Sequence, residues 1–111
     1  MRDFTDVRDV VRAYRLLLDK GEAGQAYNVC SGRGRRIREV LDMLLVSSTA
    51  KVEVRVDQER LRPSDVPAQV GDASRLRAAT GWEPRIPLEQ TLADLLGDWR
   101  TRVASTAART P

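Results

Sequence analysis

The sequence contains no histidine and only one cysteine among its 111 residues. These absences exclude an internal disulfide and a zinc site built from cysteine and histidine. They also remove the side chains that most often act as nucleophile or general base in catalysis. The single thiol, Cys30, follows a short apolar run and is interpreted as a small buried residue rather than a reactive group.

Long apolar runs and aromatic residues are also scarce. No stretch approaches the roughly 18–20 apolar residues of a membrane span, and the first residues lack the apolar segment of a secretory signal. Aromatic residues make up 5% of the chain, so we expect an aliphatic core. Together with the cysteine count, these features predict a soluble, cytoplasmic protein without a membrane partner.

The residues that are present fit one globular domain, because 41% are hydrophobic and 32% are charged. The 19 basic residues are nearly balanced by 16 acidic ones, so the chain is not a polycation and the charge gives no support to a nucleic-acid partner. Seventeen of the basic residues are arginine. Either codon usage in a GC-rich genome or a demand for planar, bidentate donors explains that excess.

Apolar periodicity predicts six elements of secondary structure. Helices are expected at 6–20, 35–47, 73–80 and 88–103, and strands at 25–30 and 51–57. Two short strands do not make a stable sheet alone, so we expect a helix-rich chain whose strand pairing or apolar surface requires a partner segment. Residues 1–103 form the expected domain, and residues 104–111, which have no apolar period, form a frayed tail.

Two polar segments have more than one interpretation. The stretch SGRGRRIRE, residues 31–39, follows a predicted strand and opens a predicted helix, but it lacks the spacing of known nucleotide-phosphate loops. It is therefore either a solvated basic turn or an anion-binding segment, and no aromatic residues are interleaved as nucleic-acid binding would require. Asp6 and Asp9 begin the first helix, where carboxylates stabilise the positive end of the helix dipole, and are interpreted as capping rather than catalytic groups.

The stretch RLRPSDVPAQVGDASRL, residues 60–76, contains Arg62, Pro63 and Asp65. Pro63 restricts Arg62 to an extended conformation, so the guanidinium and the carboxylate are displayed from one rigid turn. An arginine donates to a pyrophosphate, and an aspartate accepts from the hydroxyls of a ribose. Composition alone leaves open whether this segment is a surface turn or a nucleotide site.

Four blocks of sequence together resemble a known family. They are RDFTDVRDVVRAY, GQAYNVCSG, RLRPSDVPAQVGDASRL and TGWEPRIPLEQTLADLL. The chain resembles, from Arg2 to about Val103, the C-terminal part of the extended short-chain dehydrogenases, the NAD-dependent epimerase/dehydratase family. Within that family it is most similar to the GDP-mannose 4,6-dehydratases and GDP-4-keto-6-deoxymannose reductases. The implied fold is α/β: a helix-rich substrate-binding domain with three main helices, a shorter one and two or three short strands, without the Rossmann domain.

The resemblance also implies roles for individual residues. Arg2 and Arg62 would bind the diphosphate of a GDP-sugar, and Asp65 would bind the nucleotide ribose. The family binds NADP or NAD through a glycine-rich loop and reacts through a Ser/Thr, Tyr and Lys set. Both precede the RDF block in the family and are missing here, so this chain is expected to hold no cofactor and to be inactive alone.

The expected partners are the missing N-terminal Rossmann domain and further copies of the chain, which would associate through exposed apolar surface. Two other functions remain open at this point. One is a non-enzymatic interaction module that descends from such an enzyme. The other is a small basic nucleic-acid binder, whose affinity would fall steeply with salt.

Overall fold

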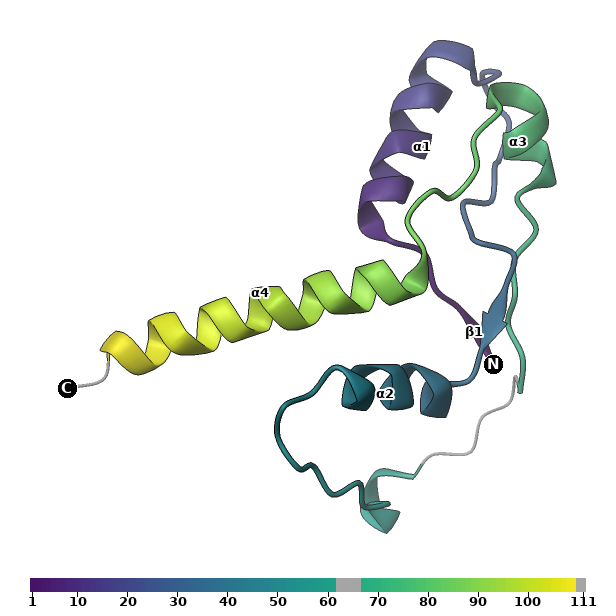
Figure 1. Cartoon of the computed structure of the whole chain (residues 1–111). Helices are drawn as coiled ribbons and strands as arrows, with labels where there is room; N and C mark the ends of the chain where they lie inside the picture. The colour runs from purple at the N-terminus through teal and green to yellow at the C-terminus, as the bar shows by residue number, and fades with distance from the viewer. Residues whose placement is uncertain (62–66, 110–111) are drawn as a thin grey trace.

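The computed structural model describes residues 1–61 and 67–109, and it gives no side-chain description beyond residue 106. Arg62 and Asp65 therefore lie outside the described residues. The elements in chain order are β1 (Arg2–Asp3), α1 (Val7–Lys20), β2 (Gly34–Arg35), α2 (Ile37–Val46), the 3-10 turn η1 (Gln58–Arg60), α3 (Ser74–Thr80) and α4 (Leu88–Arg109). Figure 1 shows α1 and α3 at one end of the molecule, α2 at the other, and α4 projecting sideways.

The helix-rich fold is as predicted, with one helix at each of the four expected places. The end expected for the last helix, Val103, is wrong, because α4 continues to Arg109. Alanine and arginine favour helix even without an apolar stripe, which explains why the helix runs past the periodic residues. Among residues 1–61 and 67–109, no helix has the length and apolar character needed to cross a membrane.

The positions predicted for the strands are wrong. The sheet consists of β1 and β2, antiparallel, with Arg2 opposite Arg35 and Asp3 opposite Gly34. A strand requires a hydrogen-bonded neighbour, and the alternating valines of 51–57 have none in the described structure, so their side chains are exposed. Residues 25–30 are extended, but side chains fix them instead of a backbone ladder: Asn28 donates to the Asp72 carbonyl, and Arg75 donates to the Ala26 carbonyl.

The core is small and lies between α1, α3 and the segment that follows α3. Its buried members are Ala13, Leu76 and Trp82, with Leu16, Leu17, Tyr27, Val29 and Ala73 packed against them. The indole Nε1 of Trp82 donates to the Asp9 carbonyl at 2.9 Å, and the Arg12 guanidinium lies 5.7 Å from the ring centre. Trp82 thus joins the chain after α3 to α1 by packing and by a buried hydrogen bond.

Two carboxylates of α1 fix the beginning of α4. Asp6 caps α1 by accepting from the Arg8 backbone N–H at 2.8 Å, and its other oxygen accepts from the Thr91 hydroxyl at 2.7 Å. Asp9 accepts from the backbone N–H groups of Arg85 and Ile86, both at 3.0 Å. The capping prediction is confirmed for Asp6. For Asp9 the main role is different, because its carboxylate satisfies backbone donors about 76 residues away in the sequence.

The molecule is open rather than spherical. Its radius of gyration is 17.9 Å, against about 13 Å for a compact chain of this length. Many large apolar side chains are exposed, including a stripe on α1 formed by Val7, Val11, Tyr14 and Leu18. The apolar exposure predicted from the sequence is therefore present, and it leaves the stability dependent on a few buried groups.

We expect Trp82→Ala to lower the free energy of unfolding by about 3–5 kcal/mol, because the side chain fills much of the core. Trp82→Phe keeps most of the packing and loses the bond to the Asp9 carbonyl, so it should cost about 1–2 kcal/mol. Urea unfolding followed by circular dichroism measures both. Equal and small losses in the two variants would contradict the central place of this ring.

The pKa of Asp6 lies well below its ordinary value of 3.8, because hydrogen bonds from the Arg8 guanidinium and the Thr91 hydroxyl outweigh the effect of burial. A carboxyl whose pKa is depressed in the folded state contributes stability above its unfolded pKa and loses it as pH falls through the folded pKa. We therefore expect the melting temperature to fall as pH drops below about 4. Asp6→Asn should melt lower at neutral pH with a flatter acid slope, and an unchanged slope would refute this assignment.

Candidate functional site

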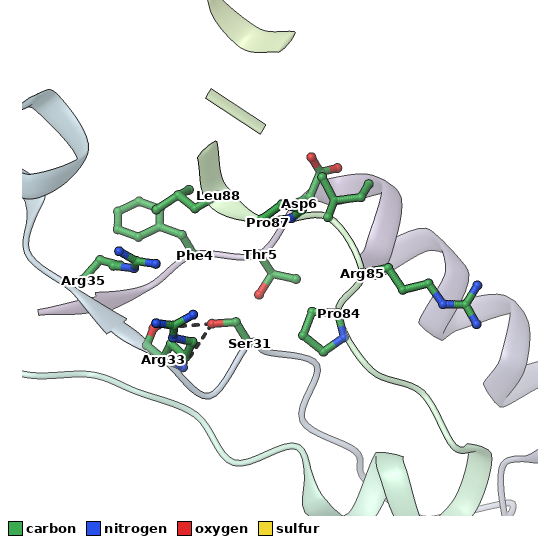
Figure 2. Close-up of a pocket in the computed structure, with 11 residues that line it drawn as sticks. Phe4, Thr5, Asp6, Ser31, Arg33, Arg35, Pro84, Arg85, Pro87 and Leu88 are labelled. Carbon is green, nitrogen blue, oxygen red and sulfur yellow. Dashed lines mark hydrogen bonds between the residues drawn. The ribbon is translucent and has the colours of Figure 1, made fainter. Parts of the chain in front are cut away.

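Two hollows lie beside the N-terminal segment. The first, here called the arginine pocket, has a volume of about 360 Å³ and is shown in Figure 2. Its lining residues are Phe4, Thr5, Asp6, Ser31, Arg33, Arg35, Pro84, Arg85, Ile86, Pro87 and Leu88. The second, the Arg2 hollow, has a volume of about 410 Å³ and is lined by Arg2, Asp3, Asn28, Val29, Cys30, Gln69, Val70 and Gly71.

Asp3 fixes the loops around both hollows. Its Oδ1 accepts from the Ser31 backbone N–H at 2.9 Å and from the Ser31 hydroxyl, and its Oδ2 accepts from the backbone N–H groups of Gly32 at 2.9 Å and Gly71 at 3.2 Å. Burial raises the pKa of this carboxyl, but the hydrogen bonds from Ser31, Gly32 and Gly71 outweigh burial, so the pKa is lower than usual. Asp3 is thus an ionised anchor for two loops.

The glycines at these loops are required by geometry. Gly32 has a φ of 78°, a left-handed conformation that side-chain-bearing residues adopt at a cost. A Cβ on Gly71 would lie 2.5 Å from the Cys30 sulfur. Burial, then the nearby Asp3 charge, raises the pKa of the Cys30 thiol, so this group stays protonated at neutral pH. Cys30 is half-buried rather than buried as the sequence predicted, and its raised pKa is in line with an unreactive thiol.

Two of the arginines that line the arginine pocket belong to the turn that precedes α2. Arg33 and Arg35 contribute to one wall, and the only carboxylate in ion-pair range of Arg35 among the described residues is Glu89, at 4.0 Å. Ser31 organises this turn, since its hydroxyl oxygen accepts from the Arg33 backbone N–H at 3.1 Å. In Figure 2 the Arg85 side chain points away from the pocket. Two arginines of the segment that the sequence marked as basic therefore line the pocket.

The other wall is apolar. Pro84, Pro87 and Leu88 belong to the chain that Asp9 holds against α1, and the Phe4 ring lies beside Leu88 in Figure 2. Asp6, the carboxylate in the lining, is already bonded to Arg8 and Thr91. The pocket therefore combines positive charge with an apolar face and offers no uncommitted carboxylate to act as a base. This composition suits binding of an anion attached to a ring.

Of the three predicted site residues, the structure describes Arg2. Arg2 lies in the Arg2 hollow, where its guanidinium donates to the Met1 carbonyl at 2.9 Å, and it faces Arg35 across the strand pair. Arg62 and Asp65 fall outside the described residues, so the turn they would form is not placed. Within the part of the chain that the structure describes, no three His, Cys, Asp or Glu side chains are grouped to hold a metal ion.

The sequence did not predict the anchoring role of Asp3 or that Arg33 and Arg35 line the same pocket. The basic turn was a visible signal for the arginines, but nothing local identified which of its four arginines would face a pocket. Asp3 gave no signal, because its partners are 28 to 68 residues away in the sequence.

We expect Asp3→Asn to lower the free energy of unfolding by about 1–3 kcal/mol, because the amide has one acceptor oxygen and turns an N–H toward backbone donors. The amide resonances of Ser31, Gly32 and Gly71 should shift together. Asp72→Asn is the matched control, since Asp72 is exposed and its carboxylate, among the described residues, accepts from the nearby Ser74 alone. If the two variants behaved alike, Asp3 would not be the anchor of these loops.

Comparison with known proteins gives consistent matches. A family model described as GDP-mannose 4,6 dehydratase matches residues 1–95. GDP-6-deoxy-D-mannose reductase of Pseudomonas aeruginosa is 43% identical over 102 residues, which cover 92% of this chain and 34% of that protein. The structure of RMD from P. aeruginosa complexed with NADPH matches with a TM-score of 0.84 at 42% identity, covering 90% of this chain and 33% of that one.

A putative epimerase from Burkholderia cenocepacia matches with a TM-score of 0.75 at 41% identity, covering 82% of this chain and 30% of that one. The chain thus spans about a third of the length of the relatives it matches. Sequence, family model and structure agree on the resemblance stated above. The chain belongs to the GDP-mannose 4,6 dehydratase family and corresponds to the C-terminal part of these extended short-chain dehydrogenases.

Proposed function

We propose that this chain is the nucleotide-sugar-binding portion of an NADP- or NAD-dependent GDP-mannose 4,6-dehydratase or GDP-4-keto-6-deoxymannose reductase. The observation that carries the proposal is the arginine pocket, in which Arg33 and Arg35 face an apolar wall. A GDP-sugar has the matching chemistry, since its diphosphate carries two negative charges and its base and sugar are rings. Guanidinium groups bind such phosphates through paired charged hydrogen bonds.

In this proposal Arg2 and Arg62 contribute to diphosphate binding and Asp65 accepts from the ribose, as the family resemblance implies. Arg2 is placed opposite Arg35 by the β1–β2 register. In this proposal both arginines contact the diphosphate, Arg35 from the arginine pocket and Arg2 from the neighbouring Arg2 hollow.

The chemical step itself is assigned to parts outside this chain. In this proposal the arginines bind the substrate, whereas the carboxylates of Asp3, Asp6 and Asp9 are engaged in structural hydrogen bonds. In the complete enzyme, binding energy from the nucleotide half would position the sugar for hydride transfer at its C4. We propose that the exposed apolar stripe on α1 packs against the dinucleotide-binding domain there, and that this chain alone is inactive.

The test is a titration of the isotope-labelled chain with GDP, followed by two-dimensional amide NMR. Arg33→Ala and Arg35→Ala should each weaken binding by roughly tenfold or more, because a charged hydrogen bond is worth about 1.5–3 kcal/mol. Arg62→Ala and Asp65→Ala should weaken it similarly. Arg15→Ala, at an exposed position on α1, is the matched control and should leave binding unchanged.

Three outcomes separate the alternatives. Saturable shifts confined to the arginine pocket and the segment near Arg2, lost in Arg33→Ala, support the proposal. A folded chain that ignores millimolar GDP would overturn it in favour of an interaction module, and equal weakening by Arg15→Ala would indicate unspecific attraction of anions. NADPH added in place of GDP should cause no comparable shifts, because the cofactor site is assigned to the other domain.

A further inference from the structure

The carboxylate of Asp3 is fully engaged by the loops beside the arginine pocket. Its Oδ1 accepts from the backbone N–H and the hydroxyl of Ser31, and its Oδ2 accepts from the backbone N–H groups of Gly32 and Gly71. An ionised carboxylate offers about four lone-pair positions, and four donors already occupy those of Asp3. Any effect of Asp3 on a ligand is therefore transmitted through the loops that it fixes.

Ser31 connects this carboxylate to the arginine pocket. Its hydroxyl donates to Asp3, and the hydroxyl oxygen accepts from the Arg33 backbone N–H at 3.1 Å. In Figure 2 dashed lines join the Ser31 hydroxyl to Arg33 at the wall of the pocket. A serine hydroxyl has one hydrogen, so donating it to Asp3 fixes the rotation of the hydroxyl and leaves its lone pairs for Arg33. Asp3 thus orients the backbone at Arg33 through one intermediate side chain.

The other side of the same turn is fixed by close packing. The β1–β2 register places Asp3 opposite Gly34, and a Cβ on Gly34 would lie 2.8 Å from Cγ2 of Val70. Gly71, the residue after Val70, donates its backbone N–H to Asp3 at 3.2 Å. The turn at 31–35 therefore lies between residues 1–3 and 69–71, and Asp3 is bonded to both neighbours of that contact.

We propose that Asp3, through Ser31, is a positioning residue for diphosphate binding. It fixes the turn that carries Arg33 and Arg35, so that both side chains extend from a backbone already in the geometry of the bound state. This inference rests on the proposed function and adds to it a residue that does not touch the substrate. Groups fixed before binding lose less conformational freedom when the ligand arrives, which increases affinity without any new contact.

The negative charge of Asp3 makes this role separable from a purely electrostatic one. A carboxylate beside a pocket that binds an anion repels the anion, so its direct Coulomb effect on GDP is unfavourable. If charge alone acted, Asp3→Asn would strengthen GDP binding. Positioning predicts weaker binding, because the amide has one acceptor oxygen and the turn loses part of its support. The two roles therefore predict changes of opposite sign.

The first test is calorimetric titration of the 111-residue chain with GDP. Asp3→Asn and Ser31→Ala should each weaken binding by about threefold to tenfold. Asp72→Asn is the control for charge, since it removes the same charge from an exposed position and should not weaken binding. Trp82→Phe is the control for stability, since it breaks a buried hydrogen bond in the core, and circular dichroism gives the folded fraction by which each affinity is corrected.

A double-mutant cycle with Arg33→Ala supplies a readout that general loosening of the fold would not produce. If Asp3 acts by placing the Arg33 guanidinium, Asp3→Asn should weaken GDP binding less in the Arg33→Ala background than in the unsubstituted chain. Ser31→Ala should behave in the same way.

The outcomes also separate this inference from the proposed function. Equal losses in the two backgrounds, a loss matched by Trp82→Phe, or tighter binding by Asp3→Asn would overturn the positioning role and leave GDP binding by the chain intact. An unsubstituted chain that ignores millimolar GDP would overturn the proposed function, and the positioning role with it.

Discussion

The arrangement of this chain depends on three carboxylates spaced three residues apart in its first segment. Asp3 binds the loops at 31–32 and 71, Asp6 binds the start of α4 through Thr91, and Asp9 binds the backbone at 85–86. Few apolar side chains are fully buried, so hydrophobic packing alone does not fix these segments. Hydrogen bonds to an ionised acceptor are stronger than hydrogen bonds between neutral groups. The bonds to these carboxylates therefore help to fix the segments in place.

The hydrogen bonds of Asp3, Asp6 and Asp9 also determine the shape of the arginine pocket. One wall includes Ser31, which is hydrogen-bonded to Asp3. The other wall is the segment from Pro84 to Leu88, whose position is fixed by the hydrogen bonds of Asp6 and Asp9. Asp6, the carboxylate in the lining of this pocket, already accepts four hydrogen bonds from Arg8 and Thr91 and is not free to serve as a base. The pocket is therefore left with a net positive lining from Arg33 and Arg35. This charge is the basis of the binding role proposed above.

Periodicity predicted the helices because each has an apolar face that repeats in sequence. The alternation at 51–57 predicted a strand wrongly, since a strand also needs a neighbour, and alternation says nothing about where one lies. The basic turn and Arg2 were visible in the sequence, and the family resemblance assigned Arg2 a ligand. The anchoring roles of Asp3 and Asp9 were not predictable, because their partners are far away along the chain and leave no local pattern.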